Sequence, residues 1–137
     1  MLKILIYFTY FLTFSSFSNE IDYDQLIYIN GLLYQKEINE VFSGNVTGLQ
    51  NGKVLHGLKE GEWKGFYDNG NLLWSGFYNK GLNISKWIEY HKNGKVFTMG
   101  HYENGKKIGV WLFYDEKGEK IAEEIFHNGS VTTKIYK

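Results

Sequence analysis

The stretch YHKNGKVFTMGHYENGKKIGVW, which runs from Tyr90 to Trp111, decides the fold. It carries two Asn-Gly pairs, Asn93-Gly94 and Asn104-Gly105, whose glycines are 11 residues apart. Asn-Gly is the strongest short-range signal for a tight hairpin, because both central residues of a type I′ turn need a positive φ. The residues left between such turns suffice for one strand but not for a helix with its loop. The stretch therefore predicts antiparallel strands joined by turns.

The same pattern recurs along the chain with a period of 24 residues. Trp63, Trp87 and Trp111 follow one another at that spacing. Turn glycines are separated alternately by 13 and 11 residues, at Gly57, Gly70, Gly81, Gly94, Gly105, Gly118 and Gly129. A repeat of this length indicates stacked supersecondary units. We therefore predict an all-β chain, an elongated, single-layer antiparallel meander of stacked β-hairpins with a period of 24 residues.

Glycines also fall in the middle of predicted strands. Gly76 and Gly100 are such positions, and glycine there usually weakens a sheet. We expect an aromatic ring of a neighbouring strand to lie over each of them. Strict alternation in the strand that contains Gly100 puts Thr98 on the same face as Gly100 and places Phe97 on the opposite face.

The region before Gly57 is irregular. Asn51-Gly52 lies five residues before Gly57, where the spacing of turns predicts 11, and we interpret this as a turn with six residues missing. Six is an even number, so the alternation of the two faces survives. Further upstream, residues 27–34 predict a hairpin around Asn30-Gly31, with a helix over residues 22–29 as the competing interpretation. Residues 131–136 predict a last strand.

The N-terminus has the pattern of a signal peptide. Lys3 precedes an apolar run from Ile4 to Phe14, and Ser16-Phe17-Ser18 supplies small residues for a cleavage site. The run is too short for a transmembrane helix, and an uncleaved anchor is the alternative. We predict export by a signal peptide over residues 1–18, to a periplasmic, cell-surface or secreted location. Residues 19–44 would then form a lead-in hairpin, and residues 45–137 a repeat sheet in one domain with it.

The repeats resemble the bacterial variant of the MORN repeat. The resemblance is carried by Tyr90 to Gly94 and by the glycines, Tyr102 and Trp111 of the stretch Gly100–Trp111, and it covers residues 27–136. It implies a twisted sheet of stacked hairpins, and similarity to antitoxins of the MORN-variant type, scaffolds and membrane-associated modules. The sequence departs from the repeat at Ser85, where a glycine is expected, at Glu124 in place of the mid-strand glycine, and at Ile135 in place of the last tryptophan.

Composition excludes several classes of function. The 15 lysines balance 15 acidic residues and there is no arginine, so nucleic acid is not expected as a partner. The absence of cysteine excludes a thiolate metal site and a cysteine nucleophile. No nucleophile elbow, zinc-protease motif or phosphate-binding loop occurs. We therefore predict a protein that is not an enzyme, with no metal site, no cofactor and no small-molecule substrate. The four histidines are expected on the surface, at His56, His91, His101 and His127.

The aromatic residues carry the remaining functional signal. Two interpretations stay open: the rings form the packed face of a thin sheet, or they form an exposed ladder that grips a partner. Trp74 does not recur in the next repeat, where Thr98 stands, and this makes it a contact candidate. The candidate binding residues are those of the aromatic face: Trp63, Trp74, Tyr78, Trp87, Tyr102 and Trp111.

Three functional hypotheses follow. The first is a protein-binding module of the antitoxin or immunity kind, with a protein partner that could be a toxin, contacted through edge strands and the aromatic face. The second is a module that binds cell-envelope glycan or choline by stacking and cation–π contact. The third is a peripheral, membrane-associated scaffold.

Overall fold

The computed structural model describes residues 19–127 and 129–136, so the predicted signal peptide over residues 1–18 lies outside the described residues. In this part the chain is nearly all β, with one short 3-10 helix, η1 (Tyr23–Gln25). The strands are β1 (Glu20–Asp22), β2 (Leu26–Ile29), β3 (Leu32–Gln35), β4 (Glu40–Val41), β5 (Gly44–Thr47), β6 (Gln50–Leu55), β7 (Leu58–Phe66), β8 (Leu72–Asn79), β9 (Leu82–Tyr90), β10 (Val96–Glu103), β11 (Lys106–Tyr114), β12 (Lys120–His127) and β13 (Ser130–Ile135).

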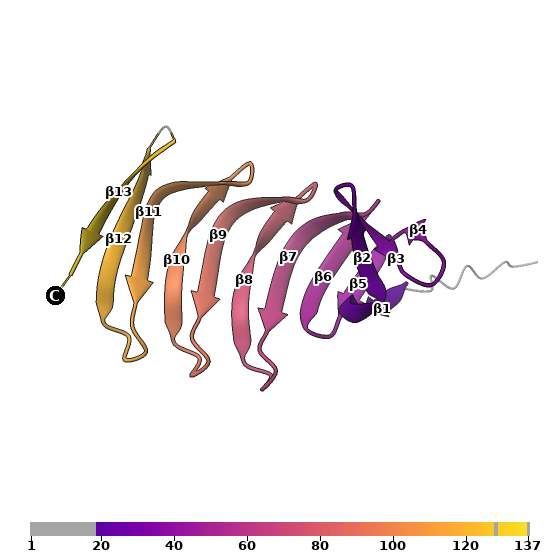
Figure 1. The fold of residues 1–137 in the computed structure, drawn as a ribbon, viewed down its shortest axis with the longest axis horizontal. Coiled ribbons are helices and arrows are strands. Elements are labelled where there is room, and N and C mark those ends of the chain that lie inside the picture. Colours follow the sequence, from indigo (N-terminus) through magenta and orange to yellow (C-terminus); the bar gives the residue numbers. More distant parts are fainter. Residues whose placement is uncertain (1–18, 128, 137) are drawn as a thin grey trace, which may run out of the picture.

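The predicted all-β meander of hairpins is confirmed. Ten strands form one sheet in the order β1-β5-β6-β7-β8-β9-β10-β11-β12-β13, and from β5 onward each strand pairs antiparallel with the next. Figure 1 shows these strands standing side by side along the long axis of the molecule. The hairpin predicted around Asn30-Gly31 is β2–β3, and the competing helix over residues 22–29 is wrong apart from the single turn of η1.

The N-terminal end of the sheet carries a cap, of which the sequence predicted only the β2–β3 hairpin. β1 pairs parallel with β5, and β2, β3 and β4 form a separate three-stranded sheet beside that end (Figure 1). Leu26, Leu33 and Phe42 of this region pack with Val54 and Trp63 in one buried cluster. Because these side chains cover the first strands of the long sheet, the N-terminal end has a two-layer core while the rest is a single sheet.

Two turn types explain the alternating glycine spacing. At one end of the hairpins, two-residue turns have a positive φ at both positions, as at Asn30-Gly31 and Asn104-Gly105. At the other end only the glycine has a positive φ, and at Gly94 the loop closes with hydrogen bonds from His91 N to Lys95 O and from Gly94 N to His91 O. The prediction of type I′ geometry at Asn93-Gly94 is therefore wrong, because that loop is longer and only its glycine needs the left-handed region.

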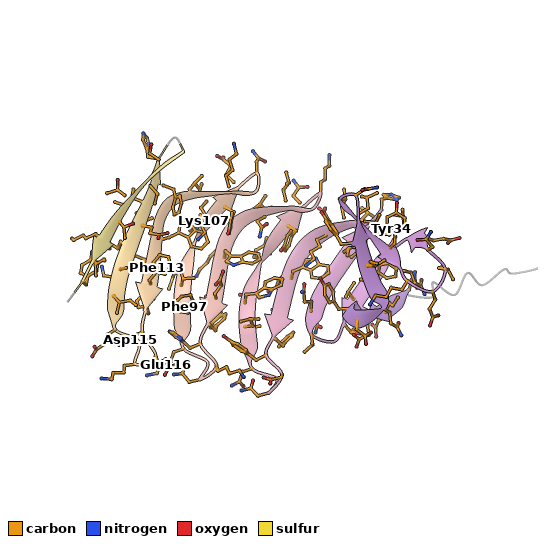
Figure 2. All side chains as sticks on the ribbon, in the orientation of Figure 1. Tyr34, Phe97, Lys107, Phe113, Asp115 and Glu116 are labelled. Carbon is orange, nitrogen blue, oxygen red and sulfur yellow. The ribbon has the colours of Figure 1, made fainter. Side chains whose placement is uncertain are left out.

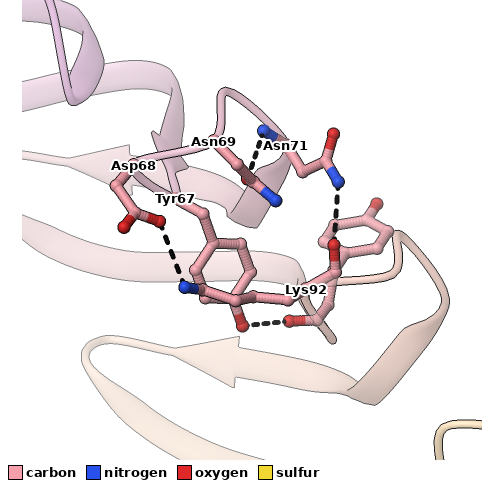
Figure 3. Close-up of polar contacts among 6 residues, drawn as sticks. Tyr67, Asp68, Asn69, Asn71 and Lys92 are labelled. Carbon is pink, nitrogen blue, oxygen red and sulfur yellow. Dashed lines mark hydrogen bonds and ion pairs between the residues drawn. The ribbon is translucent and has the colours of Figure 1, made fainter.

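The longer loops lie along the lower edge of Figure 1, and hydrogen bonds link each of them to the next. Figure 3 shows one junction, where the Tyr67 hydroxyl donates to Tyr90 O at 2.7 Å and the Asn71 side-chain amide donates to Lys92 O at 2.8 Å. Lys92 also pairs with Asp68, at 3.1 Å. At the next junction the equivalent oxygen, Glu116 O, accepts from a different donor, the Asn93 side-chain amide, at 2.9 Å. These bonds hold successive repeats in register.

The irregularity before Gly57 has a different cause from the one predicted. Gly52 is no turn residue: it lies within β6, opposite Val46 of β5. The turn between β5 and β6 contains Gly48, which has a φ of +89°. Gly48 lies nine residues before Gly57, so this hairpin is shorter than the pattern by two residues, not six. The sequence interpretation was wrong because an Asn-Gly pair also fits a mid-strand glycine.

A β-bulge changes one predicted face. The register of β10 against β9 shifts between Val96 and Thr98, so that Phe97 is an extra residue in β10. The centroid of the Phe97 ring lies 6.1 Å from that of Phe113, which pairs with Thr98 on the other neighbouring strand (Figure 2). Phe97 therefore does not lie on the face opposite to Thr98, as strict alternation predicted. The extra residue of a bulge interrupts the two-residue period, which sequence alternation cannot reveal.

A bend recurs in the long strands at 24-residue spacing. Gly61, Ser85 and Gly109 have φ values of +70°, +60° and +63° in β7, β9 and β11. Figure 1 shows these strands curving toward their upper ends. Serine is costly in this region because its β-carbon approaches the backbone carbonyl.

We expect Ser85→Gly to stabilise the protein, because glycine adopts the left-handed region without that clash. The free energy of unfolding should rise by about 1 kcal/mol in urea titrations. The matched reverse change, Gly109→Ser, should lower it by about the same amount. If Ser85→Gly were neutral or destabilising, strain at this bend would not be the reason for the glycines at the equivalent positions.

Candidate functional site

We define the inner face of the sheet as the face that bears Trp63, Trp87 and Trp111. On this face each of these indole rings packs against the backbone of a glycine in the preceding strand. A β-carbon added to Gly52 or Gly100 would lie 2.3 Å from a ring atom of Trp63 or Trp111, and one added to Gly76 would lie 2.0 Å from Trp87. These indoles thus rest directly on the preceding strand. The expected ring over Gly76 and Gly100 is present, and each tryptophan stands 11 residues after its glycine.

The rings of successive repeats meet edge to face. Tyr78 contacts Trp63 and Trp87 at centroid distances of 6.2 and 5.8 Å, and Tyr102 contacts Trp87 and Trp111 at 5.7 and 5.1 Å. Trp63 and Trp111 are 0% exposed and Trp87 is 7% exposed. Edge-to-face pairs stabilise folds beyond the area that they bury. The structure therefore supports the packing interpretation for these three tryptophans, because a partner cannot stack on buried rings.

The middle tryptophan departs from the repeat. The indole N–H groups of Trp63 and Trp111 donate to the backbone oxygens of Lys53 and His101, at 3.0 and 3.3 Å. The N–H of Trp87 instead donates to Glu89 Oε1 at 3.2 Å. The residues equivalent to Glu89 in the other repeats are glycine and phenylalanine, which offer no side-chain acceptor.

Trp74 is half-buried and stacks on Trp87, with centroids 4.8 Å apart and an interplanar angle of 11°. A β-carbon at Gly65 would lie 2.1 Å from Trp74 Nε1, so Trp74 also rests on bare backbone. Among the six candidates, Trp74, Tyr78 and Tyr102 retain partial exposure. All six candidate residues thus lie together on the inner face, and the side chains of these three are partly accessible to a ligand.

Lys59 lies among aromatic rings that sequence analysis did not connect with it. Its Nζ atom is 4.2 Å from the centroid of Trp63, and 5.5, 5.5 and 5.2 Å from those of Tyr23, Trp74 and Tyr78. Its Nζ donates to Gln50 Oε1 at 2.7 Å. Burial lowers the pKa of the Lys59 ammonium to about 8. We call Lys59 and the four rings around its ammonium group, those of Tyr23, Trp63, Trp74 and Tyr78, the Lys59 cage.

A sequence signal for the cage existed in the 24-residue period. Lys59 and Lys107 occupy equivalent positions, four residues before Trp63 and Trp111, and Asn83 stands at the same position in the repeat between them. Lys107 Nζ lies 4.1 Å from the Trp111 centroid, which matches the geometry at Trp63 (Lys107 is labelled in Figure 2). Both lysines precede the strand bend, which carries their ammonium groups over the indoles.

The two ends of the long sheet differ. β1 and the three-stranded sheet cover one end, whereas β13 pairs only with β12 in the described part of the chain. All six residues of β13 are exposed, with Val131 at 54% and Ile135 at 76%. Tyr136 N donates a hydrogen bond to Ile121 O of β12. In an antiparallel ladder, hydrogen-bonded and non-hydrogen-bonded residue pairs alternate, so every second residue, counting back from Ile135, is not bonded to β12. The backbone N–H and C=O groups of Val131, Thr133 and Ile135 therefore point away from β12, toward the free edge.

Other chemistry is sparse in the described residues. No group of three or more His, Asp or Glu side chains in residues 19–127 and 129–136 is arranged to hold a metal ion. Within the same residues, no helix has the length and apolar character needed to cross a membrane. His91 Nε2 lies 2.9 Å from Tyr114 O, which gives this histidine a place in the junctions between loops.

Comparison with known proteins identifies no family. No family model matches the sequence, and no curated protein matches it. Among solved structures the chain is similar to the crystal structure of a GtfA/B complex bound to UDP and GlcNAc, with 11% sequence identity and a TM-score of 0.24. The similarity covers 80% of this chain and 23% of that chain. At that TM-score the likeness carries no argument about fold or function.

Proposed function

We propose that this chain is a non-catalytic protein-binding module that adds an extended segment of its partner to the free edge of β13. The observation that carries the proposal is that, in residues 19–127 and 129–136, no strand pairs with the outer edge of β13, toward which the backbone groups of Val131, Thr133 and Ile135 point. Exposed strand edges pair readily with other chains, and natural proteins usually block them with charge, proline or a covering element.

β13 has few of these protective features. Lys134 is its one charged residue, and it contains no proline. Val131 and Ile135 lie on the inner side, because Thr133 between them pairs with Glu124, which pairs with Trp111. A partner strand would therefore find backbone hydrogen bonds at the edge and apolar side chains beside it, which are the two elements of strand addition.

The kind of partner is proposed from the resemblance to variant MORN-repeat proteins. An antitoxin or immunity role would make the partner a toxin. The expected signal peptide would place the interaction outside the cytoplasm, where immunity to an exported toxin can act.

The proposal is tested by photo-crosslinking in the native cells. A benzoylphenylalanine at position 135 should capture a defined protein partner, because Ile135 lies on the free edge and is exposed. The same probe at position 92, on a loop at the lower edge of the sheet, is the control site. Thr133→Pro should abolish the product by removing an outward donor, whereas Thr133→Val should preserve it.

Thr133→Pro removes no ladder bond to β12, so its thermal unfolding should stay close to that of the parent. A product that forms equally from positions 92 and 135, or that survives Thr133→Pro in a folded protein, would contradict binding at this edge.

A further inference from the structure

A cavity of about 510 Å³ lies where the β2–β3 hairpin meets the starts of β7 and β9. Its walls include Tyr23, Tyr28, Leu33, Lys59, Tyr78 and Leu82. Ligand pockets typically have volumes of about 300–1,000 Å³ and combine apolar walls with a few polar groups. The cavity is independent of the free edge of β13, which lies at the opposite end of the sheet (Figure 1).

All the charged side chains that line this cavity are positive. Lys59 and Lys80 are the charged residues among those that line it, and no carboxylate does so. Lys80 is exposed, which leaves Lys59 as the cation that is partly withdrawn from water. Among the described residues no ion pair involves Lys59, and its hydrogen bond goes to the neutral Gln50 amide.

An ammonium withdrawn from water without a counter-ion is unfavourable. The ring faces of the Lys59 cage offset part of this cost by cation–π attraction. An anion would offset more of it, because opposite charges attract strongly where water is partly excluded. One partly buried cation suits a ligand with a single negative charge, and the leucine and tyrosine walls suit an apolar body.

We propose that this cavity binds small amphipathic carboxylates, with the carboxylate paired to Lys59 and the apolar chain against Tyr28, Leu33 and Leu82. Tyr23 and Tyr78 line the cavity and also flank the Lys59 ammonium, so they connect the site of charge to the apolar walls. Binding would draw on the same ammonium that the cage holds over Trp63.

The test uses octanoate as the probe, followed by tryptophan fluorescence and calorimetry on the full chain at pH 7. We expect saturable binding at one site. Acetate, which lacks the chain, octanol, which lacks the charge, and octyltrimethylammonium, which has the opposite charge, should each bind at least about tenfold more weakly. No saturable octanoate binding, or equal binding of octyltrimethylammonium, would overturn the proposal.

Variants locate the site. Lys59→Met should weaken octanoate binding at least about tenfold, and Lys59→Arg should retain it. The matched control is Lys107→Met, which removes the equivalent lysine over Trp111 and should change affinity less than about twofold. Loss of binding with Lys107→Met, or retention with Lys59→Met, would place the ligand elsewhere.

Octanoate affinity can also be measured on the unmodified protein over a range of pH, and this test does not depend on whether a variant folds. The ammonium form of a group whose pKa is about 8 falls about thirtyfold between pH 7 and pH 9.5, and octanoate affinity should fall with it. Tyr23, Tyr28, Tyr78 and Lys80 are the other titratable groups that line the cavity. Lys59→Met should bind weakly and without this pH dependence. Unchanged affinity of the parent across the series would contradict a role for the Lys59 charge.

Discussion

Replacing Trp63 by alanine is expected to lower the free energy of unfolding by about 3–5 kcal/mol, because it empties a large, fully buried site. Trp63 is 0% exposed and belongs to the cluster that joins the N-terminal cap to the long sheet. The change also leaves Lys53 O without the indole donor that it has at 3.0 Å. Urea titration followed by far-UV circular dichroism measures the loss.

Trp74→Ala is the matched control for this prediction. Trp74 lies on the same face and also contacts a glycine, but it is partly exposed. We expect it to cost less than half as much as Trp63→Ala, since less apolar surface is removed from contact. Equal losses for the two variants, or a loss of less than about 1 kcal/mol for Trp63→Ala, would contradict the assignment of the tryptophans to core and surface.

The second large effect is expected at Gly100. Alanine there would place its β-carbon 2.3 Å from Trp111 Cδ2, and Trp111 is fully buried, so either the ring or the strand must move. We expect Gly100→Ala to destabilise by about 2–3 kcal/mol in the same titrations. Backbone conformation is not the cause, because the φ of Gly100 lies outside the positive region.

Glu124→Ala provides the control, because Glu124 stands at the equivalent position one repeat later, where Ile135 replaces the tryptophan. It should change stability by less than about 0.5 kcal/mol. In addition, Gly100→Ala should cost less in a Trp111→Phe background, because the smaller ring leaves room for the methyl group. Strictly additive losses would show that the indole does not set the need for glycine.

The fold could be predicted from sequence because its signals repeat. The spacing of Trp63, Trp87 and Trp111 and of the turn glycines predicts two antiparallel strands in each repeat and the turns that connect them. Where one residue type serves two purposes, prediction failed: Gly52 follows an asparagine as turn glycines do, yet it lies under Trp63. The predicted face of Phe97 was wrong as well, because the one inserted residue of a β-bulge leaves composition and spacing nearly unchanged.

The candidate site was less predictable for a physical reason. The tryptophans are visible in sequence, but whether their rings are covered depends on Lys59, Tyr78 and the strand bend. The cavity near Lys59 draws its walls from η1, β2–β3 and the starts of β7 and β9, which only the folded chain brings together. The prediction that there is no small-molecule substrate rested on missing enzyme motifs, and such motifs carry no information about a binding cavity.

The central claim is that the outer edge of β13 is open for strand addition, and amide hydrogen exchange measured by NMR tests it most directly. In the free chain we predict fast exchange at Val131, Thr133 and Ile135, and at least about tenfold slower exchange at Thr132 and Lys134, which bond to β12. With the captured partner bound, the three outward amides should become slow. Equal protection of all five amides in the free chain, or fast outward amides in the complex, would contradict the claim.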